Sequence, residues 1–156
     1  MAAGVRVKGL PGVMAMLERT GDKMHRSVRD IAAKGAEDIK NTAFDMAPIR
    51  TGDLEKSIRV KTENVSGGRV AHIVYIDETR WDHRHQSDYY VRVHEGIGGR
   101  GGSADYGNTP AGIAKSVQTG EKVGPKYLYR ALKRWEPTIK ARVRQALARI
   151  AARGGR

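Results

Sequence analysis

The chain of 156 residues has the length of one domain and is large enough to bury a core. Hydrophobic residues make up 39% and charged residues 29%, which indicates a globular protein with a well-solvated surface. The absence of cysteine excludes disulfides, thiolate metal sites and cysteine nucleophiles. No apolar run approaches the roughly 20 residues that span a bilayer. We therefore expect a soluble single domain, residues 1–156, that is made and used in a cytoplasm.

The net charge of +12 arises from 29 Lys and Arg residues against 17 Asp and Glu residues. A surplus of this size favours a polyanionic partner such as nucleic acid, although a solubilising surface explains it equally well. The surplus is concentrated at one end, because residues 133–156 contain eight basic residues and one acid.

A short N-terminal arm, residues 1–10, precedes a segment, residues 11–47, that is predicted to be helical. Its apolar residues recur at intervals of three and four, which places them on one helical face. A break near Thr20 and Gly21 is an alternative to one continuous helix. Pro48 ends the helix, because the residue before a proline is driven out of the α region. The apolar face consists of Leu17, Met24, Val28, Ile31, Ala32, Gly35, Ile39, Ala43 and Met46.

Residues 54–95 are predicted to form antiparallel strands. Leu54, Ile58 and Val60 begin a period-two pattern that is typical of a half-buried strand. A hairpin turn is expected at residues 66–68, a second strand at residues 69–77 and a third at residues 89–95. The predicted fold class is therefore α+β: a small antiparallel sheet of three to four strands packed against a long N-terminal and a long C-terminal helix.

The rest of the chain divides into a loop, a helix and a tail. Residues 96–124 contain nine glycines and predict a long loop that is either disordered or functional. Residues 125–153 predict a helix, kinked or restarted at Pro137, and residues 154–156 a frayed tail. The helix carries an apolar stripe of Leu128, Leu132, Trp135, Ile139, Val143, Leu147 and Ile150.

Three features could suggest catalysis or ligand binding, and each lacks an essential part. The segment 82–85, with His72 and His94 on predicted strands, offers metal-binding side chains, but not at a convincing zinc spacing. The glycines of residues 96–102 lack the Lys-Ser/Thr pair of a phosphate-binding loop. Ser57 does not lie in the Gly-x-Ser-x-Gly turn of a hydrolase nucleophile. We therefore predict no catalytic, cofactor or metal site, and no enzyme.

The basic C-terminal helix is the strongest candidate for function. Arg142, Arg149 and Arg153 are spaced by seven and four residues and share one side, while Lys140 and Arg144 lie on the turns between them. Such a surface could hold DNA through its phosphates without reading the sequence. The alternative is an ordinary solvated helix face.

One segment resembles a known family. Residues 47–58 resemble the "A-P-x-x-T-G-x-L-x-x-S-I" signature of the tail-completion, or neck, family of lambdoid and related long-tailed bacteriophages, whose members join the phage head to the tail. Residues 90–96 are similar to its "Y-x-x-x-x-E-x-G" strand, and residues 124–132 to its "P-F-L-x-P-A-L" helix entry. The matching residues are Ala47, Pro48, Thr51, Gly52, Leu54, Ser57, Ile58, Tyr90, Glu95, Gly96, Pro125, Leu128, Ala131 and Leu132.

The chain departs from the family pattern in two places. Ile97 and Gly98 replace the Gly-Thr pair after the second motif. In the third motif Lys126 is inserted, Tyr127 replaces Phe and Arg130 replaces Pro. The resemblance extends over about residues 10–152, and its residues are structural.

The resemblance implies an α+β subunit of the virion neck that assembles into a homo-oligomeric ring, expected to be a hexamer. Other neck and tail proteins would be its partners, and genomic DNA would pass through the ring without sequence-specific contact. The Gly-rich segment would reach a neighbouring subunit through Gly96, Gly98, Gly99, Arg100, Gly101 and Gly102. A monomeric nonspecific nucleic-acid binder is the first alternative, and a metal-dependent hydrolase using residues 82–85 is the second.

Overall fold

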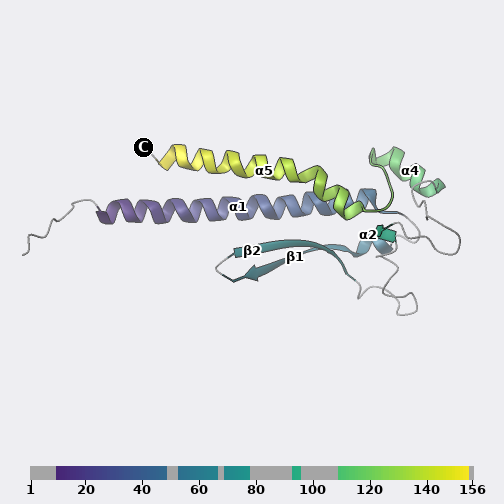
Figure 1. Cartoon of the computed structure of the whole chain (residues 1–156), viewed down its shortest axis with the longest axis horizontal. Helices are drawn as coiled ribbons and strands as arrows, with labels where there is room; N and C mark the ends of the chain where they lie inside the picture. Colours follow the sequence, from purple (N-terminus) through teal and green to yellow (C-terminus); the bar gives the residue numbers. More distant parts are fainter. Residues whose placement is uncertain (1–9, 49–52, 67–68, 78–92, 96–108, 155–156) are drawn as a thin grey trace, which may run out of the picture.

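The computed structural model describes residues 10–48, 53–66, 69–77, 93–95 and 109–154. These residues form two long helices, α1 (Leu10–Met46) and α5 (Tyr127–Gly154), and two short helices, α2 (Asp53–Ser57) and α4 (Pro110–Thr119). The strands are β1 (Ile58–Val65) and β2 (Arg69–Ile76). Figure 1 shows α1 lying between α5 on one side and the β1–β2 hairpin on the other. The predicted α+β class, with a long helix near each end and an antiparallel sheet, is confirmed.

Helix α1 confirms the prediction for residues 11–47. It runs without a break through Thr20 and Gly21, and the chain leaves the helix just before Pro48. The two long helices approach closely where Gly35 of α1 faces Ile139 of α5. A Cβ added at Gly35 would lie only 2.6 Å from Ile139 Cδ1, so this contact depends on glycine.

The described sheet contains two strands rather than three or four. β1 and β2 pair antiparallel, with Ile58 opposite Ile76 and Val65 opposite Arg69. The prediction of a third strand was wrong for residues 93–95, which are helical, and residues 89–92 lie outside the described part. A period-two pattern of so few residues cannot be distinguished from one helical turn.

The strand predicted from residue 54 was also wrong for its first four residues, which belong to helix α2. Leu54 and Ile58 are both buried, and their spacing of four is the helical repeat as well as an even number of strand positions. The Ser57 hydroxyl donates a hydrogen bond of 2.6 Å to the Leu54 carbonyl, which favours the helical turn over an extended chain.

The predicted loop 96–124 contains helix α4, so the loop prediction was wrong for residues 110–119. Thr109 caps the helix start, because its side chain accepts a 3.1 Å hydrogen bond from the Gly112 N–H. Pro110 occupies the first helical turn, and Gly120 ends the helix in a left-handed conformation with φ of 70°. Residues 96–108, including the predicted interface glycines, lie outside the described part.

Helix α5 confirms the predicted C-terminal helix and continues through Pro137. In Figure 1 its first turns point in a different direction from its long straight part, as expected where a proline removes a backbone hydrogen bond. One stripe residue was predicted wrongly: Leu132 is 45% exposed, whereas Tyr127 and Ala131 are fully buried. The buried face at the start of α5 is therefore shifted by one residue.

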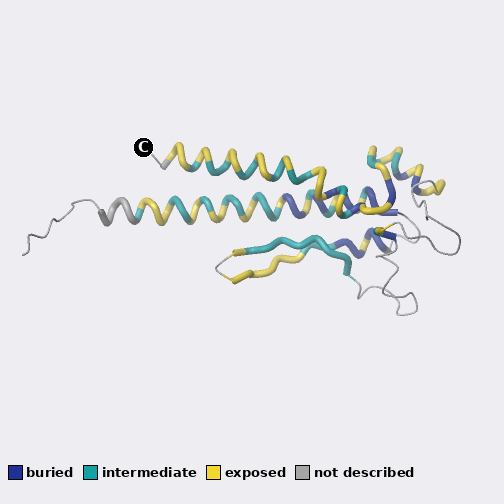
Figure 2. Tube along the Cα trace, in the orientation of Figure 1, coloured by how far each residue is buried: buried dark blue, intermediate teal, exposed yellow. Residues whose placement is uncertain are grey.

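The core gathers at one end of the molecule, where the last turns of α1 meet α2 and the start of α5 (Figure 2). Val93 also packs into it, and Val74, Ile76, Leu128, Trp135 and Ile139 pack around it. None of the helices that the structure describes is long and apolar enough to cross a membrane. The buried core residues are Ile39, Ala43, Met46, Ala47, Leu54, Ile58, Val93, Tyr127 and Ala131.

Candidate assembly and nucleic-acid surfaces

The first family motif forms the corner between α1 and the hairpin. Ala47 and Pro48 are buried directly after α1, and Leu54 and Ile58 insert into the core from α2 and β1. The backbone N–H of Asp77 closes the corner by donating 2.8 Å to the Ser57 carbonyl at the base of the hairpin. Thr51 and Gly52 lie outside the described residues. The described residues of the first motif are therefore buried where α1, α2 and β1 meet.

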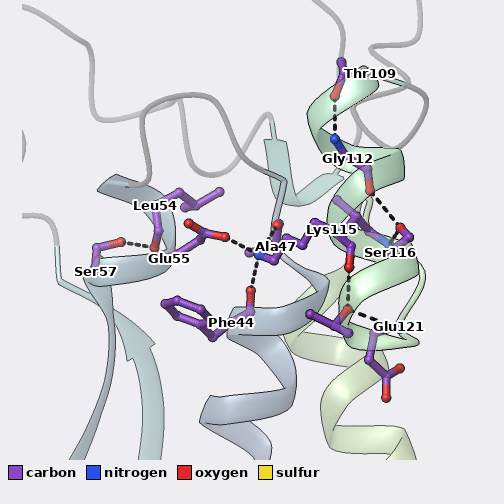
Figure 3. Close-up of polar contacts among 12 residues, drawn as sticks. Phe44, Ala47, Leu54, Glu55, Ser57, Thr109, Gly112, Lys115, Ser116 and Glu121 are labelled. Atoms are coloured by element: carbon purple, nitrogen blue, oxygen red, sulfur yellow. Dashed lines mark hydrogen bonds and ion pairs between the residues drawn. The ribbon is translucent and has the colours of Figure 1, made fainter.

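A buried ion pair reinforces this corner, and sequence reasoning missed it. Lys115 of α4 extends between α1 and α2, where its ammonium group meets the Glu55 carboxylate (Figure 3). Both side chains are nearly inaccessible, at 5% and 10% exposure. Lys115 Nζ also donates to the carbonyls of Phe44 (2.5 Å) and Ala47 (2.9 Å), and it lies 5.1 Å from the Phe44 ring centroid.

The segment around α4 thus caps the C-terminal end of α1. The last carbonyls of a helix have no partner within the helix and carry partial negative charge, which a cation offsets. Lys115 supplies that cation, and the Gly124 N–H donates 3.0 Å to the Met46 carbonyl. The sequence signal for this role was a lone lysine in a short helix that otherwise contains no charged residue.

The second and third motifs meet at the start of α5. The Lys126 N–H donates 2.5 Å to the His94 carbonyl, and the His94 ring packs edge-on against Tyr127 with centroids 5.1 Å apart. Lys126, the inserted residue, has a positive φ of 55°, which is uncommon for a residue other than glycine. Burial is the main factor that lowers the His94 pKa from its usual 6.5; nearby Lys126 also lowers it and Glu95 opposes the shift. Tyr90 and Gly96 lie outside the described residues.

The remaining residues of these motifs differ in burial. Ala131 is fully buried and Leu128 packs partly buried against the core, whereas Glu95 and Pro125 are exposed. Only part of the third motif therefore contributes to the core.

The basic residues of α5 do not form one uniform surface. Arg142 is engaged with α1: its guanidinium lies 3.1 Å from the Asp38 carboxylate and 5.6 Å from the centre of the Trp135 ring. Trp135 is itself tied to α1, because its indole N–H donates 2.8 Å to the Thr42 hydroxyl. Arg142 therefore contributes to the contact between the long helices.

The other four residues predicted to face DNA, Lys140, Arg144, Arg149 and Arg153, are exposed on α5. Lys140 pairs with Glu136 one turn earlier, at 2.7 Å. Arg144, Arg149 and Arg153 have no acidic partner among the described residues. These three arginines leave a positive surface available along the second half of α5.

The N-terminal half of α1 leaves apolar surface uncovered. Within the described side chains of residues 15–34 none is fully buried, although the apolar spacing continues throughout. Leu17 is 65% exposed, and Met24, Val28 and Ala32 are only partly covered. The chain therefore carries more apolar helix surface than its own fold covers.

Metal-binding side chains do not converge in the described part of the chain, where no group of three or more His, Asp or Glu residues could hold an ion. His72 instead faces Thr62 on the neighbouring strand, with Nδ1 3.0 Å from the hydroxyl. His94 lies at the core beside Tyr127. Residues 82–85 lie outside the described part.

The fold and these surfaces define a small α+β protein with a core at one end, uncovered apolar surface at the other and a basic terminal helix. A profile of the HK97-gp10-like family, described as "Bacteriophage HK97-gp10, putative tail-component", matches residues 12–94, just over half of the chain. The chain belongs to this family, which confirms the resemblance noted from its motifs and supports a structural role in a bacteriophage. Searches of curated proteins and of solved structures found no match.

Proposed function

We propose that the chain is a structural protein of the phage neck, a tail-completion or head–tail connector component. Six copies of it form a ring, and genomic DNA passes through that ring. Membership of a phage tail-component family supports a structural role in a phage. The observation that carries the proposal is the uncovered apolar face of α1. Burying an aliphatic side chain yields about 1.5–3 kcal/mol, so a surface of this kind favours assembly.

Electron microscopy of the purified protein, alone and added to phage tails made without it, tests the proposal. We expect closed rings of six copies and rings at the head-proximal end of the tails. Native mass measurement checks the number of copies. A protein that stays monomeric and does not bind tails contradicts the proposal.

We propose that Arg144, Arg149 and Arg153 face the DNA. Phosphate contacts hold DNA without reading its sequence, and removing one such contact lowers the slope of log K against log salt by about 0.9. Changing all three arginines to Gln should therefore weaken binding to any duplex and flatten the slope by about 2–3 per subunit. Titrations of labelled duplex at several salt concentrations measure both.

The matched control removes the same charge elsewhere. Lys34, Lys56 and Lys122 are exposed and lie on α1, on α2 and after α4. Changing these three to Gln should leave the salt slope close to that of the original protein. An equal loss of affinity in both triple variants would show that net charge, rather than the α5 surface, attracts the DNA.

The alternative function, a nonspecific nucleic-acid-binding protein acting through the same helix, rests on the same three arginines. It predicts a monomer with strong, salt-sensitive DNA binding and no binding to tails. The ring proposal predicts assembly in the absence of DNA, so sizing the protein after nuclease treatment separates the two.

A further inference from the structure

Helix α4 has an unusual arrangement of polar and apolar side chains. Lys115 is the only charged residue between Pro110 and Thr119, and it points inward to the end of α1. Ile113 and Val117 are 52% and 80% exposed, respectively. They lie four residues apart and therefore share one helix face. Ile113 and Val117 together form an exposed apolar ridge on a helix face that carries no charge.

A groove lined partly by apolar side chains lies elsewhere on the same chain. Met24, Val28 and Ala32 of α1, Val70 of β2 and Leu147 of α5 are its apolar lining residues. The groove has a volume of about 420 Å³. Pockets of about 300–1,000 Å³ hold whole small ligands, so two aliphatic side chains fit this volume. Its remaining lining residues, His25, Arg29 and Arg69, are cationic or polar.

The ridge on α4 cannot reach the groove of its own chain. Lys115 fixes α4 at the C-terminal end of α1, beside Ala47. Val28 lies 19 residues earlier on a continuous helix, which at 1.5 Å per residue is about 28 Å away. In Figure 1 α4 lies beyond the end of α1, away from its middle turns. The two surfaces can therefore meet only between different molecules.

We infer that the Ile113–Val117 ridge of α4 docks into the Met24–Val28–Ala32 groove of a second copy of this chain. The charges are compatible with this occupant: on a chain of net charge +12, the outer face of α4 presents no charged side chain, so it approaches Arg29 and Arg69 without like-charge repulsion. The contact joins two different surfaces, and a head-to-tail contact of this kind closes into a ring when its rotation permits. The inference rests on the proposed function and identifies the two faces that would build the ring.

Cysteine crosslinking tests the inference directly, because the chain has no cysteine of its own. The variants are Val117→Cys, Val28→Cys and the double variant, each treated with a short bismaleimide and run on a denaturing gel. The double variant should give a ladder from dimer up to the full ring, and an equal mixture of the single variants should give dimers only. Each single variant should remain a monomer on the gel.

Two matched variants control for chance encounters and for misfolding. The pair Val117→Cys and Lys133→Cys places the second thiol on an exposed position of α5 outside the groove and should give no ladder. Val117→Asp should abolish rings, whereas Gln118→Asp, at the exposed neighbouring position, should preserve them. Both aspartate variants should keep the circular dichroism and melting temperature of the single copy, because neither side chain is buried.

The outcomes separate this inference from the proposed function. Rings that persist in Val117→Asp, or Val117→Cys chains that crosslink to one another without Val28→Cys, overturn the inference and leave the ring proposal standing. Val117→Asp rings that form normally but fail to join tails would assign the ridge to another tail protein and also overturn it. An unsubstituted chain that forms no ring, alone or on tails, overturns both.

Discussion

The change Lys115→Met tests whether the buried ion pair holds α4 and the hairpin corner to the end of α1. Methionine keeps the length of the side chain but removes the ammonium group. Glu55 then remains as a buried carboxylate without its cation. The Ala47 carbonyl loses the Lys115 donor, and the Phe44 carbonyl keeps only the 3.4 Å hydrogen bond from the Ala47 N–H. Glu55 and Ala47 are buried, so the loss of the ammonium group is costly for the carboxylate and for the Ala47 carbonyl.

The expected loss of stability follows from this geometry. Removing one partner of a buried ion pair typically costs about 3–5 kcal/mol. For a chain of this size that lowers the melting temperature on the order of 10 °C. Changing Glu55→Met as well removes the isolated charge, so the double variant should recover part of the loss, while the Ala47 carbonyl still lacks the Lys115 donor.

Urea unfolding followed by circular dichroism, at one fixed subunit concentration, measures these changes. Lys122→Met is the matched control, because Lys122 is exposed in the same segment; its free energy of unfolding should stay within about 0.5 kcal/mol of the original. If Lys115→Met unfolds no more easily than Lys122→Met, the pair is hydrated or dispensable, and the description of α4 as the cap of α1 is refuted.

Two further predictions concern α1 and the start of α5. Gly35→Ala should destabilise the fold by about 1–3 kcal/mol, because the added Cβ would clash with Ile139. Gly21→Ala, whose Cβ would have no atom within 4 Å, should stabilise the fold by about 0.5–1 kcal/mol. Urea midpoints of the two variants that shift in the same direction would contradict this prediction. The lowered pKa of His94 means that the unfolded chain binds a proton near pH 6.5 that the folded chain resists, so stability should fall as the pH drops below about 6.5. The fall between pH 7 and 5 should be smaller in His94→Gln, and an identical pH profile would show that His94 does not contribute.

The long helices could be predicted from the sequence because their apolar spacing extends over many turns. A period sustained from Met24 to Met46 leaves no alternative secondary structure, and Pro48 supplies the end. Shorter patterns were ambiguous. Leu54 and Ile58 fit a strand and a helical turn equally well, and the tertiary contacts of α2 decided between them.

Helix α4 was missed although its end signals are present in the sequence. Thr109 and Pro110 mark a helix start, and Gly120 marks an end. The density of glycines in the surrounding segment outweighed these signals. The partner of Lys115 could not be predicted at all, because Glu55 lies 60 residues away and the two meet only through the packing of α4 on α1.

The basic surface of α5 was partly predictable. Spacing placed Arg142, Arg149 and Arg153 on one side, but it could not show that Arg142 would be used by Asp38 within the chain. The spacing of charged residues along one helix shows only which of them lie on the same side of that helix. Which of those charges remain available depends on the neighbouring helix, which the spacing does not describe.

The same reasoning applies to the apolar face of α1, and it bears on assembly. The spacing is equally regular in both halves of the helix, yet full burial occurs only in the C-terminal half, in the core with Leu54, Val93 and Tyr127. Regularly spaced apolar residues of a helix are buried in the functional state, and in that state contacts with other molecules can bury them as well. The groove at Val28 lies where the pattern continues beyond the core. Assembly through that groove would account for apolar positions that the single chain buries only in part.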